Sequence, residues 1–383
     1  MRTKTRIPSF SHYLSFISRT ARRIPPLKIG YFIIDSMTFK YRRKITITEQ
    51  SGNNLSDYQV RIDLDATNFD FSHAQTNGED IRFTDESGNL LDYWIEEWDA
   101  LNEKAKIWVK APSIPANSSV EIYCYYGNSE ITSASDASAT FIRIIDGVVG
   151  SWHFDEGSGT TAYDTSGNDN DGALVNGPTW VDGKFGKALQ FDETQDQYVE
   201  VPDDPSLDIT GEITIEAWVK WNSAAAEHNI IVAKGTSNDY YNPYQFRVDR
   251  DTGVVRATTP KVIGSSAWYH IDGSVDENWH HLVWTVEGST SRIYIDTVVD
   301  EETFDGTWTT NDEPLLIGIR GAFAPFHGIM DEVRLYNRAL TAEEISDIYN
   351  NYGYTTENYP GKVLVRKYTE PEPSISIGGE ESA

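Results

Sequence analysis

The chain has 383 residues, of which 39% are hydrophobic and 12% aromatic, and its formal net charge is -27 at pH 7. This composition suits globular domains with apolar cores and excludes a largely disordered chain. The acidic charge excludes nucleic acid and anionic membrane surfaces as expected partners, because lysine and arginine must meet the phosphates of such partners.

The first 36 residues differ from the rest, because they carry seven basic side chains and one acidic side chain. Residues 1–37 are therefore expected to be a disordered basic extension outside the first domain. The segment lacks the continuous apolar core and small-residue cleavage site of a secretory signal. Two interpretations stay open: an over-extended translation start, since Met37 precedes the first patterned strand, or an amphipathic interfacial or export segment. No stretch of the chain approaches the roughly 20 apolar residues that a transmembrane helix needs.

Short runs of alternating apolar residues fill residues 38–130 and predict the half-buried strands of a β-sandwich. Turn-forming residues such as 85–89 separate these runs. Cys124 lies within one run and is expected to be a small buried hydrophobe; as the sole cysteine it cannot form an internal disulfide. The segments 41–45, 77–85, 93–98 and 122–128 resemble domain of unknown function 2341, found in bacterial and archaeal surface proteins. The resemblance implies no known chemistry.

Residues 131–140 are rich in Ser, Ala, Thr and Asp without apolar periodicity, which predicts a linker. Residues 141–352 then carry a second set of motifs in a fixed order, namely 149–157, 164–168, 186–191, 213–220, 279–283 and 328–340. Together these resemble the laminin-G-like, concanavalin-A-type jelly roll, which the first domain type often precedes. The resemblance implies an all-β module that usually binds glycans, proteins or a structural calcium and is more often an accessory to chemistry than its agent.

A short helix is expected after the jelly roll, at residues 341–349. Thr341 and Glu344 have the spacing of a capping box, and Ile345, Ile348 and Tyr349 share one face. Residues 353–383 are expected to be a tail, because the Pro, Ser and Glu at the end of the chain offer too little apolar surface to fold. The predicted fold class is therefore all-β, with two β-sandwich domains in series and a short C-terminal helix.

Catalysis is not expected. A glycosidase needs two carboxylates roughly 5 to 9.5 Å apart. Glucanases of the resembling fold take theirs from one strand, but the equivalent strand here offers Glu216 alone, and Glu97 with Asp99 lacks a third carboxylate. His280 and His281 are adjacent in a strand, so they point to opposite faces and cannot share a metal.

Calcium is the better candidate ligand, because it prefers six to eight oxygen ligands from irregular loops. Residues 164–172 offer many such oxygens. The resemblance implies a structural calcium held by Asp331, which begins the closing strand, with Asp155, Asp164 and Asn168. The alternative interpretation stays open: Asp and Asn in such a string also build β-turns through bonds to the backbone.

Glycan binding requires an aromatic face with polar groups around it. The aromatic segments between strands supply five candidate ligand-binding residues: Tyr240, Tyr241, Tyr244, Trp268 and Tyr269. We therefore expect a non-catalytic recognition protein that binds a glycan or a protein at an extracellular, cell or virion surface. Two alternatives remain, a structural or assembly protein with no small ligand and an accessory fragment of a glycoside hydrolase.

Overall fold

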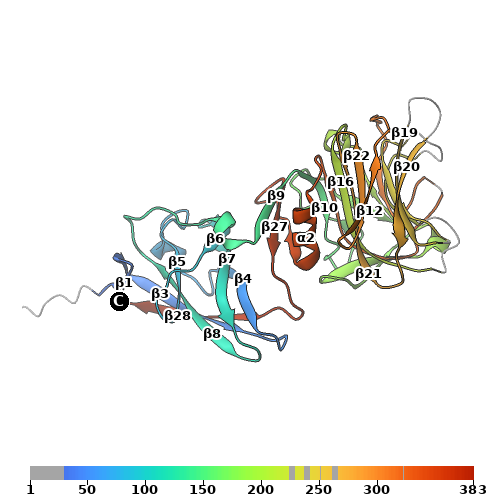
Figure 1. The fold of residues 1–383 in the computed structure, drawn as a ribbon. Coiled ribbons are helices and arrows are strands. Elements are labelled where there is room, and N and C mark those ends of the chain that lie inside the picture. The colour runs from blue at the N-terminus through green and yellow to red at the C-terminus, as the bar shows by residue number, and fades with distance from the viewer. Residues whose placement is uncertain (1–29, 224–228, 237–241, 251, 261–265, 322) are drawn as a thin grey trace, which may run out of the picture.

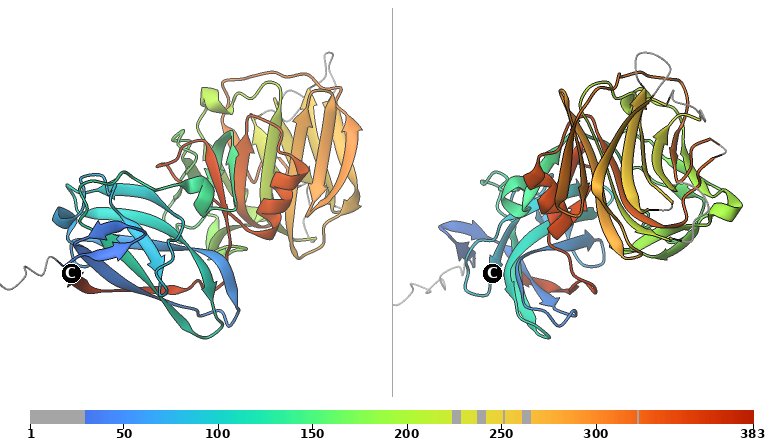
Figure 2. Two further views of the ribbon diagram at one scale, coloured as in Figure 1. Left: turned by 60° about the vertical axis from the view of Figure 1, so that its left-hand side comes forward. Right: turned by 45° about the vertical axis from the view of Figure 1, so that its right-hand side comes forward.

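The computed structural model describes residues 30–223, 229–236, 242–250, 252–260, 266–321 and 323–383. These residues form two β-sandwich modules that lie side by side, with a small sheet and a helix between them (Figure 1). The same separation is seen from two other directions (Figure 2). In the described part of the chain, no helix is long and apolar enough to cross a membrane.

The first module packs two antiparallel sheets face to face. One sheet has the order β28 (Ser374–Ser382), β3 (Tyr41–Thr48), β8 (Ser119–Tyr126) and β5 (Arg82–Asp85). The other has the order β4 (Leu55–Asp65), β7 (Lys104–Ile114) and β6 (Tyr93–Asp99). Alternate residues of these strands, such as Ile45, Ile62 and Ile107, are buried in one core together with Cys124. The alternation in the sequence thus predicted the inward faces correctly.

The first module begins earlier than expected. A hairpin of β1 (Phe32–Ile34) and β2 (Met37–Phe39) precedes β3, and β1 lies within the segment that was expected to be an extension. The ring of Phe32 lies edge-on to Tyr125 at 5.9 Å, and Phe39 is fully buried. Residues 1–29 lie outside the described residues, so the two interpretations of the basic segment stay predictions.

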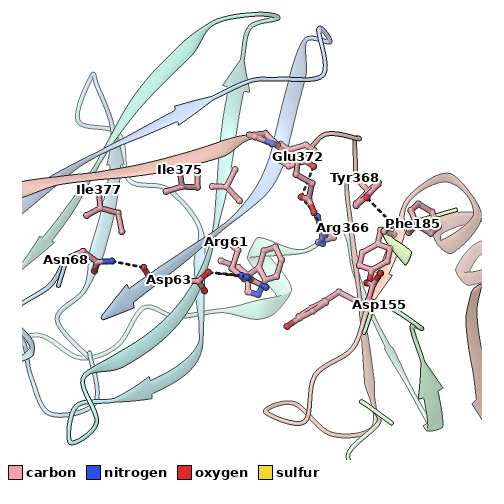
Figure 3. A pocket seen from close by; sticks show the side chains of 17 residues that line it. Arg61, Asp63, Asn68, Asp155, Phe185, Arg366, Tyr368, Glu372, Ile375 and Ile377 are labelled. Carbon is pink, nitrogen blue, oxygen red and sulfur yellow. Dashed lines mark hydrogen bonds and ion pairs between the residues drawn. The ribbon is translucent and has the colours of Figure 1, made fainter. Parts of the chain in front are cut away.

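The C-terminal segment is folded, contrary to the expected tail. Strand β28 pairs antiparallel with β3 along most of its length, and Ile375 and Ile377 pack against the core of the first module (Figure 3). The prediction was wrong because it counted only the segment's own apolar surface. Two isoleucines on alternate positions are enough when another strand supplies the hydrogen bonds and the apolar face.

The second module is a jelly roll of two packed antiparallel sheets. The first sheet has the order β13 (Thr179–Asp182), β14 (Lys187–Phe191), β25 (Gly328–Tyr336), β16 (Ile213–Trp221), β21 (Trp279–Glu287), β22 (Thr290–Ile295) and β23 (Val298–Thr303), and β10 (Val148–Trp152) pairs with β25. The second has the order β11 (Thr161–Ala162), β12 (Gly172–Val175), β15 (Tyr198–Val201), β24 (Leu315–Ile317), β17 (Asn229–Lys234), β18 (Gln245–Val248), β19 (Val254–Pro260) and β20 (Ser266–Ser274). Short 3-10 turns lie at Phe71–His73 in the first module and at Glu193–Gln195 and Pro205–Leu207 here.

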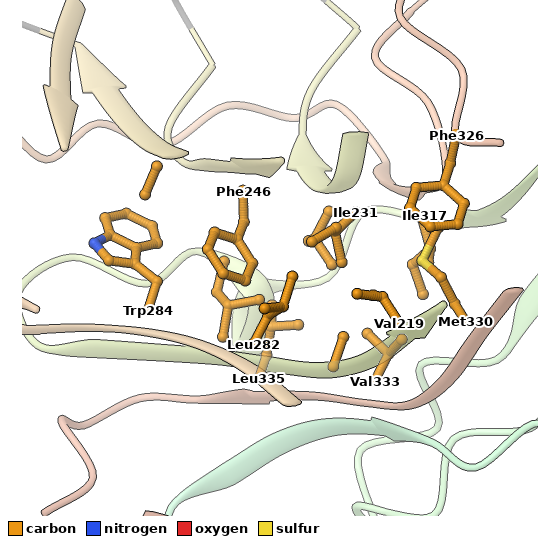
Figure 4. Close-up of a cluster of buried hydrophobic side chains, with 14 of the residues drawn as sticks. Val219, Ile231, Phe246, Leu282, Trp284, Ile317, Phe326, Met330, Val333 and Leu335 are labelled. Carbon is orange, nitrogen blue, oxygen red and sulfur yellow. The ribbon is translucent and has the colours of Figure 1, made fainter. Parts of the chain in front are cut away.

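The jelly-roll core lies between these two sheets. Val219 and Leu282 point from the first sheet toward Ile231, Phe246 and Ile317 of the second (Figure 4). Burying an apolar side chain of this size stabilises the fold by about 1.5 to 3 kcal/mol. The all-β fold class with two sandwiches is confirmed.

Helix α2 (Ala342–Asn350) covers the outer face of the first jelly-roll sheet. Its predicted capping box is confirmed, since the Glu344 amide donates to Thr341 Oγ1 at 3.2 Å and the Thr341 amide donates to Glu344 Oε2 at 2.9 Å. Ile345 and Ile348 are buried, and the ring of Tyr349 stacks on Trp218 at 5.6 Å. The helix therefore seals part of this sheet from solvent.

A small sheet with the order β26 (Tyr352–Tyr354), β27 (Lys362–Arg366) and β9 (Arg143–Asp146) joins the modules. The expected linker ends in the short helix α1 (Ala137–Thr140), whose Ala137 is buried. Trp94 and Trp108 of the first module pack against Phe141 and Leu364. An apolar cluster therefore fixes the two modules to one another, where the sequence predicted a linker.

Candidate functional site

The aromatic candidates for glycan contact are not a surface group in the described structure. Tyr240, Tyr241 and the side chain of Trp268 lie outside the described residues. Tyr244 is fully buried and donates its hydroxyl to the Leu207 carbonyl at 2.8 Å.

Tyr269 is 1% exposed, and its ring stacks on Trp284 and Phe304. Its hydroxyl accepts the Gly306 amide at 3.0 Å. The expectation that Tyr244 and Tyr269 meet a ligand is wrong, because both point into the sandwich. A loop-like composition does not reveal which way a ring turns.

The carboxylate of Asp164 organises the string 164–172 as a turn. Its oxygens accept the amides of Ser151 at 2.8 Å, Ser166 at 2.9 Å and Asn170 at 3.0 Å, and the Ser166 hydroxyl at 2.7 Å. The Asn168 amide group donates to the Val149 carbonyl at 3.0 Å. Asp164 thus has the contacts of the turn-building alternative, and four donors already occupy its oxygens.

Asp331 and Glu332 lie at a β-bulge where β25 pairs with β16. Met330 and Val333 face the core, while the register shifts between Glu216 and Trp218 on the partner strand and Glu332 has a positive φ of 53°. In a regular strand Asp331 and Glu332 would face opposite sides; the bulge turns both away from the core. A strict two-residue alternation could not have predicted this arrangement.

The carboxylate of Asp331 holds the hairpin between β13 and β14. Its Oδ2 accepts the amides of Lys184 at 2.8 Å and Phe185 at 2.9 Å, and Asp155 Oδ1 accepts the amide of Lys187 at 2.7 Å. Asp331 is fully buried, and its Oδ1 has no hydrogen-bond partner among the described residues. The two aspartates therefore clamp one hairpin from two sides.

Burial sets the charge behaviour of both aspartates. Desolvation and the charge of Glu332 raise the pKa of Asp331 well above its usual range. Desolvation and Glu332 also raise the pKa of Asp155 to about 6, although Asp155 stands at the rim with part of its surface in solvent. The charge of Asp155 also contributes to the raised pKa of Asp331, so the carboxylate form is disfavoured at both positions.

Two glycines let the hairpin come this close. A Cβ at position 183 would lie 2.6 Å from Asp331 Oδ2, and one at Gly186 would lie 2.2 Å from Asp155 Oδ1. Gly186 also has a positive φ of 58°, which side chains other than glycine rarely adopt. Because Gly183 and Gly186 allow this close approach, Phe185, which lies between these two glycines in the sequence, projects toward the first module.

Glu216 lies in a closed ionic network under helix α2. Its Oε1 accepts from Arg334 and from the Tyr336 hydroxyl, each at 2.8 Å, and its Oε2 lies 3.3 Å from His281 Nε2. Arg334 also binds Glu332, which in turn contacts His153 Nδ1 at 2.9 Å. Glu216 and Arg334 are 0% and 1% exposed.

This network prevents Glu216 from acting as an acid. Although burial opposes ionisation, the hydrogen bond with His281 and the charge of Arg334 lower its pKa to about 2. A carboxyl with that pKa holds no proton to donate near neutral pH, and no substrate reaches a side chain this buried. The neighbouring His280 contacts Asp296 at 3.0 Å instead, so the two adjacent histidines do serve different sites.

A cleft of about 630 Å³ opens where the two modules and the C-terminal segment meet. Arg61 and Asp63 of β4 line its wall on the first module, whereas Asp155 and Phe185 line its wall on the jelly roll (Figure 3). Tyr368 connects the two sides. It stands after β27, and its hydroxyl accepts the Gly186 amide at 3.3 Å.

Arg366 is the central support of this cleft. It is 5% exposed, donates to both carboxylate oxygens of Glu372 at 2.9 and 2.8 Å, and has its guanidinium over the rings of Trp108, Tyr352 and Tyr368 at 4.8 to 5.5 Å. A guanidinium held by rings and a bidentate carboxylate is rigid. The wall of the cleft is therefore set before any ligand arrives.

Apart from Asp155, which was expected to hold calcium, sequence reasoning missed the residues of this cleft. Tyr354, Arg366, Tyr368 and the lining residues between 372 and 377 lie in the segment that was expected to be a tail, and the lining residues between 58 and 186 are far away along the chain. The density of tyrosines at 352, 354, 359 and 368 was the available signal. Among the described residues, no three His, Cys, Asp or Glu side chains form a group that could hold a metal ion.

Comparison with known proteins agrees with both resemblances. Residues 192–346 match the family described as the concanavalin A-like lectin/glucanases superfamily, and residues 77–169 match domain of unknown function DUF2341. The two matches occur in the predicted order, which confirms the recognition of both modules. No curated protein matches the chain.

Three of the solved structures that match the chain are the following. The binding domain of Paraclostridial Mosquitocidal Protein 1 is 18% identical with a TM-score of 0.45, covering 53% of this chain and 52% of that one. Domain 4 of AbnA, a GH43 extracellular arabinanase from Geobacillus stearothermophilus in complex with arabinotriose, is 21% identical with a TM-score of 0.42, covering 53% and 98%. The receptor binding domain of botulinum neurotoxin D is 13% identical with a TM-score of 0.42, covering 57% and 56%. The chain thus spans about half of the first structure's length.

Proposed function

We propose that this chain is a non-catalytic recognition protein that binds a glycan or a protein ligand in the cleft between its two modules, at an extracellular, cell or virion surface. The observation that carries the proposal is the convergence of half-buried rings and paired charges from both modules on one concave site. Sites of this kind lie preferentially at domain interfaces and fix their ligand with a few polar groups around apolar surface. Binding of the full chain to an immobilised glycan panel and to surface proteins tests this proposal directly.

The absence of hydrolysis is the first expected result. Because Glu216 is buried and fully ionised near neutral pH, incubating the chain with β-glucans, galactans and sialosides should release no reducing ends above the level without protein. A reducing-end assay over many hours measures this. Sustained turnover that disappears in Glu216→Gln, but not in the exposed variant Glu287→Gln, would contradict the non-catalytic proposal.

We also propose a structural calcium beside the hairpin of β13 and β14. Asp331 Oδ1 is a buried carboxylate oxygen without a hydrogen-bond partner among the described residues, and Asp155 contributes negative charge to the same place. These two residues would hold the ion with backbone carbonyls. Asp164 and Asn168 suit it less well, because their side chains already bind backbone groups of the turn.

Calcium is therefore expected to raise the melting temperature of the full chain and chelator to lower it. A ligand that binds only the folded state adds about 2.7 kcal/mol at a hundredfold excess over its Kd. Asp331→Asn, which keeps an acceptor for the hairpin amides, should remove the difference between calcium and chelator, whereas the exposed Asp169→Asn should keep it. An unchanged difference in Asp331→Asn would remove Asp331 from the site.

A second candidate function is that of a structural or assembly protein. The apolar cluster of Trp94, Trp108, Phe141 and Leu364 fixes the angle between the modules, as a rigid spacer would need. The two candidates differ in one measurement. If the chain is only a spacer, the cleft holds no ligand, and substitutions of the residues that line the cleft would change the affinity for no glycan or protein.

A further inference from the structure

We propose that the cleft between the modules is a composite site for an uncharged oligosaccharide, to which the first module, the jelly roll and the C-terminal segment each contribute. This inference rests on the proposed recognition function and names its ligand class and its site. Three features of the cleft carry it: the rings that line it, the pairing of its charges and its position across the junction.

Three aromatic side chains of the cleft are half-buried, so part of each ring faces the open space. They are Phe185 on the hairpin of the jelly roll, Tyr354 on β26 and Tyr368 after β27. Phe185 and Tyr368 meet edge to face at 5.2 Å, which fixes both orientations. Partly exposed rings held in fixed positions provide the apolar surface on which the C–H face of a sugar ring packs.

The cleft holds its charges in pairs. Arg61 lies 3.2 Å from Asp63, and Arg366 is bound through two hydrogen bonds to Glu372. Asp155 adds a further carboxylate at the rim of the jelly roll. An anionic sugar would have to compete with these carboxylates for the two guanidinium groups, whereas hydroxyl groups can donate to Asp63 and Asp155 and accept from Arg61 without breaking an ion pair. The charge pattern therefore favours an uncharged, hydroxyl-rich ligand.

The size and shape of the cleft favour a short chain of sugars over a protein surface. Its volume of about 630 Å³ lies within the range of small-ligand sites, roughly 300 to 1,000 Å³. A stable protein interface instead buries about 800 Å² on each partner and is seldom confined to a single cleft. The cleft therefore suits an oligosaccharide better than a protein ligand.

The site exists only when both modules are docked. Arg61 and Asp63 come from β4, Phe185 comes from a loop between β13 and β14, and Tyr368 accepts the Gly186 amide at 3.3 Å across the cleft. The bond between the Tyr58 hydroxyl and Glu372 at 3.1 Å ties the C-terminal segment to the first module. These contacts orient the rings in advance, so that little conformational entropy is lost when a ligand binds.

The test measures the affinity of the full chain for oligosaccharides by calorimetric titration. The neutral ligands are glucan, galactan and arabinan fragments, and the acidic ligands are uronate and sialylated fragments. We expect neutral fragments to bind, and Tyr368→Ala and Arg61→Ala each to weaken binding about tenfold or more. Phe323→Ala removes a ring of similar size that is 52% exposed on the jelly roll and does not line the cleft, and it should leave affinity unchanged. Tyr368→Leu and Arg61→Gln serve as milder variants, and melting temperatures confirm that each variant is folded.

Four results would overturn the inference in distinguishable ways. Tighter binding of acidic fragments that still depends on Tyr368 would overturn the ligand class and keep the cleft. Neutral binding that no cleft variant weakens would overturn the site and keep glycan recognition. Binding of a purified surface protein without any glycan would overturn the inference while leaving the wider recognition proposal standing. Binding of no glycan and no protein would overturn both.

Discussion

Replacing Arg334 by Met is expected to lower the free energy of unfolding by about 3 to 5 kcal/mol, the cost of removing one partner from a buried ion pair. Arg334 is 1% exposed and binds both Glu216 and Glu332, which are themselves fully or almost fully buried. The substitution leaves two carboxylates without the cation that compensates them. Methionine fills much of the same volume, so the loss measures charge and hydrogen bonding more than packing. Urea unfolding at pH 7, followed by tryptophan fluorescence, gives the difference.

Arg292→Met is the matched control for this prediction. Arg292 stands on β22 in the same sheet and pairs with Glu287 and Glu301, but those partners are exposed, so its loss should cost no more than about 1 kcal/mol. Equal losses in the two variants would show that the buried network contributes no more than a surface pair.

The pH dependence of the Arg334→Met effect gives a second readout. In the folded wild-type chain the pKa of Glu216 is lowered to about 2, from an ordinary value of 4.5. A lowered folded-state pKa contributes stability that is present above about 4.5 and is lost as the pH falls toward 2. Without Arg334 that stabilisation is reduced, and protonation relieves the buried charge. The difference between wild type and variant should therefore be largest near neutral pH and shrink below pH 4.5, and a constant difference would contradict the electrostatic account.

The regular parts of the fold follow from the sequence because they depend on local alternation. In β16, Ile215, Ala217 and Val219 point into the core and Glu216 points out, as a two-residue period requires. The capping box at Thr341 is equally local, since four consecutive residues contain both of its hydrogen bonds. Such features need no knowledge of the partner elements.

The site could not be predicted in the same way, because it depends on contacts between distant segments. The bulge at Asp331 and Glu332 appears only when β25 is placed against β16, and it changes which side chains reach the hairpin of Phe185. The rings of Tyr244 and Tyr269 have the composition of a ligand site, yet the sheet turns them inward. Composition thus could not show which way these rings point, because tertiary pairing determines it.

The C-terminal strand shows the same principle at the largest sequence separation. Ile377 pairs with Ile45, 332 positions away, and the hydrogen bonds of β28 come from β3 alone. A residue-by-residue assessment of residues 374–382 finds two isoleucines among serines, glycines and glutamates, which is too little to fold in isolation. These residues therefore form a strand only because β3 of the first module offers them an edge, and that edge of β3 stays unpaired until β28 binds to it.

Deletion of residues 374–383 is accordingly expected to destabilise the first module by about 3 kcal/mol or more. The deletion removes the strand that pairs with the edge of β3 and the apolar contacts of Ile375 and Ile377 with the core. A fully buried isoleucine stabilises a fold by roughly 1.5 to 3 kcal/mol, and each of these two partly buried side chains contributes part of that amount. It also leaves the β3 edge free to pair with other chains. Hydrogen exchange should show lost protection of the β3 amides that face β28, while the jelly-roll strands keep theirs.

Two point variants separate the contribution of the apolar face from that of the backbone pairing. Ile377→Asp places a charge against the core of the first module and should lower its stability by about 2 kcal/mol or more, whereas Ser376→Asp, exposed on the neighbouring position of the same strand, should change it by no more than about 0.5 kcal/mol. A synthetic peptide of residues 374–383 added to the truncated chain should restore protection at β3, because the edge of β3 that it needs is held in place by the pairing of β3 with β8. An unchanged denaturation midpoint and unchanged exchange at β3 after the deletion would show that the first module is complete without its C-terminal strand, and that the chain end merely lies along it.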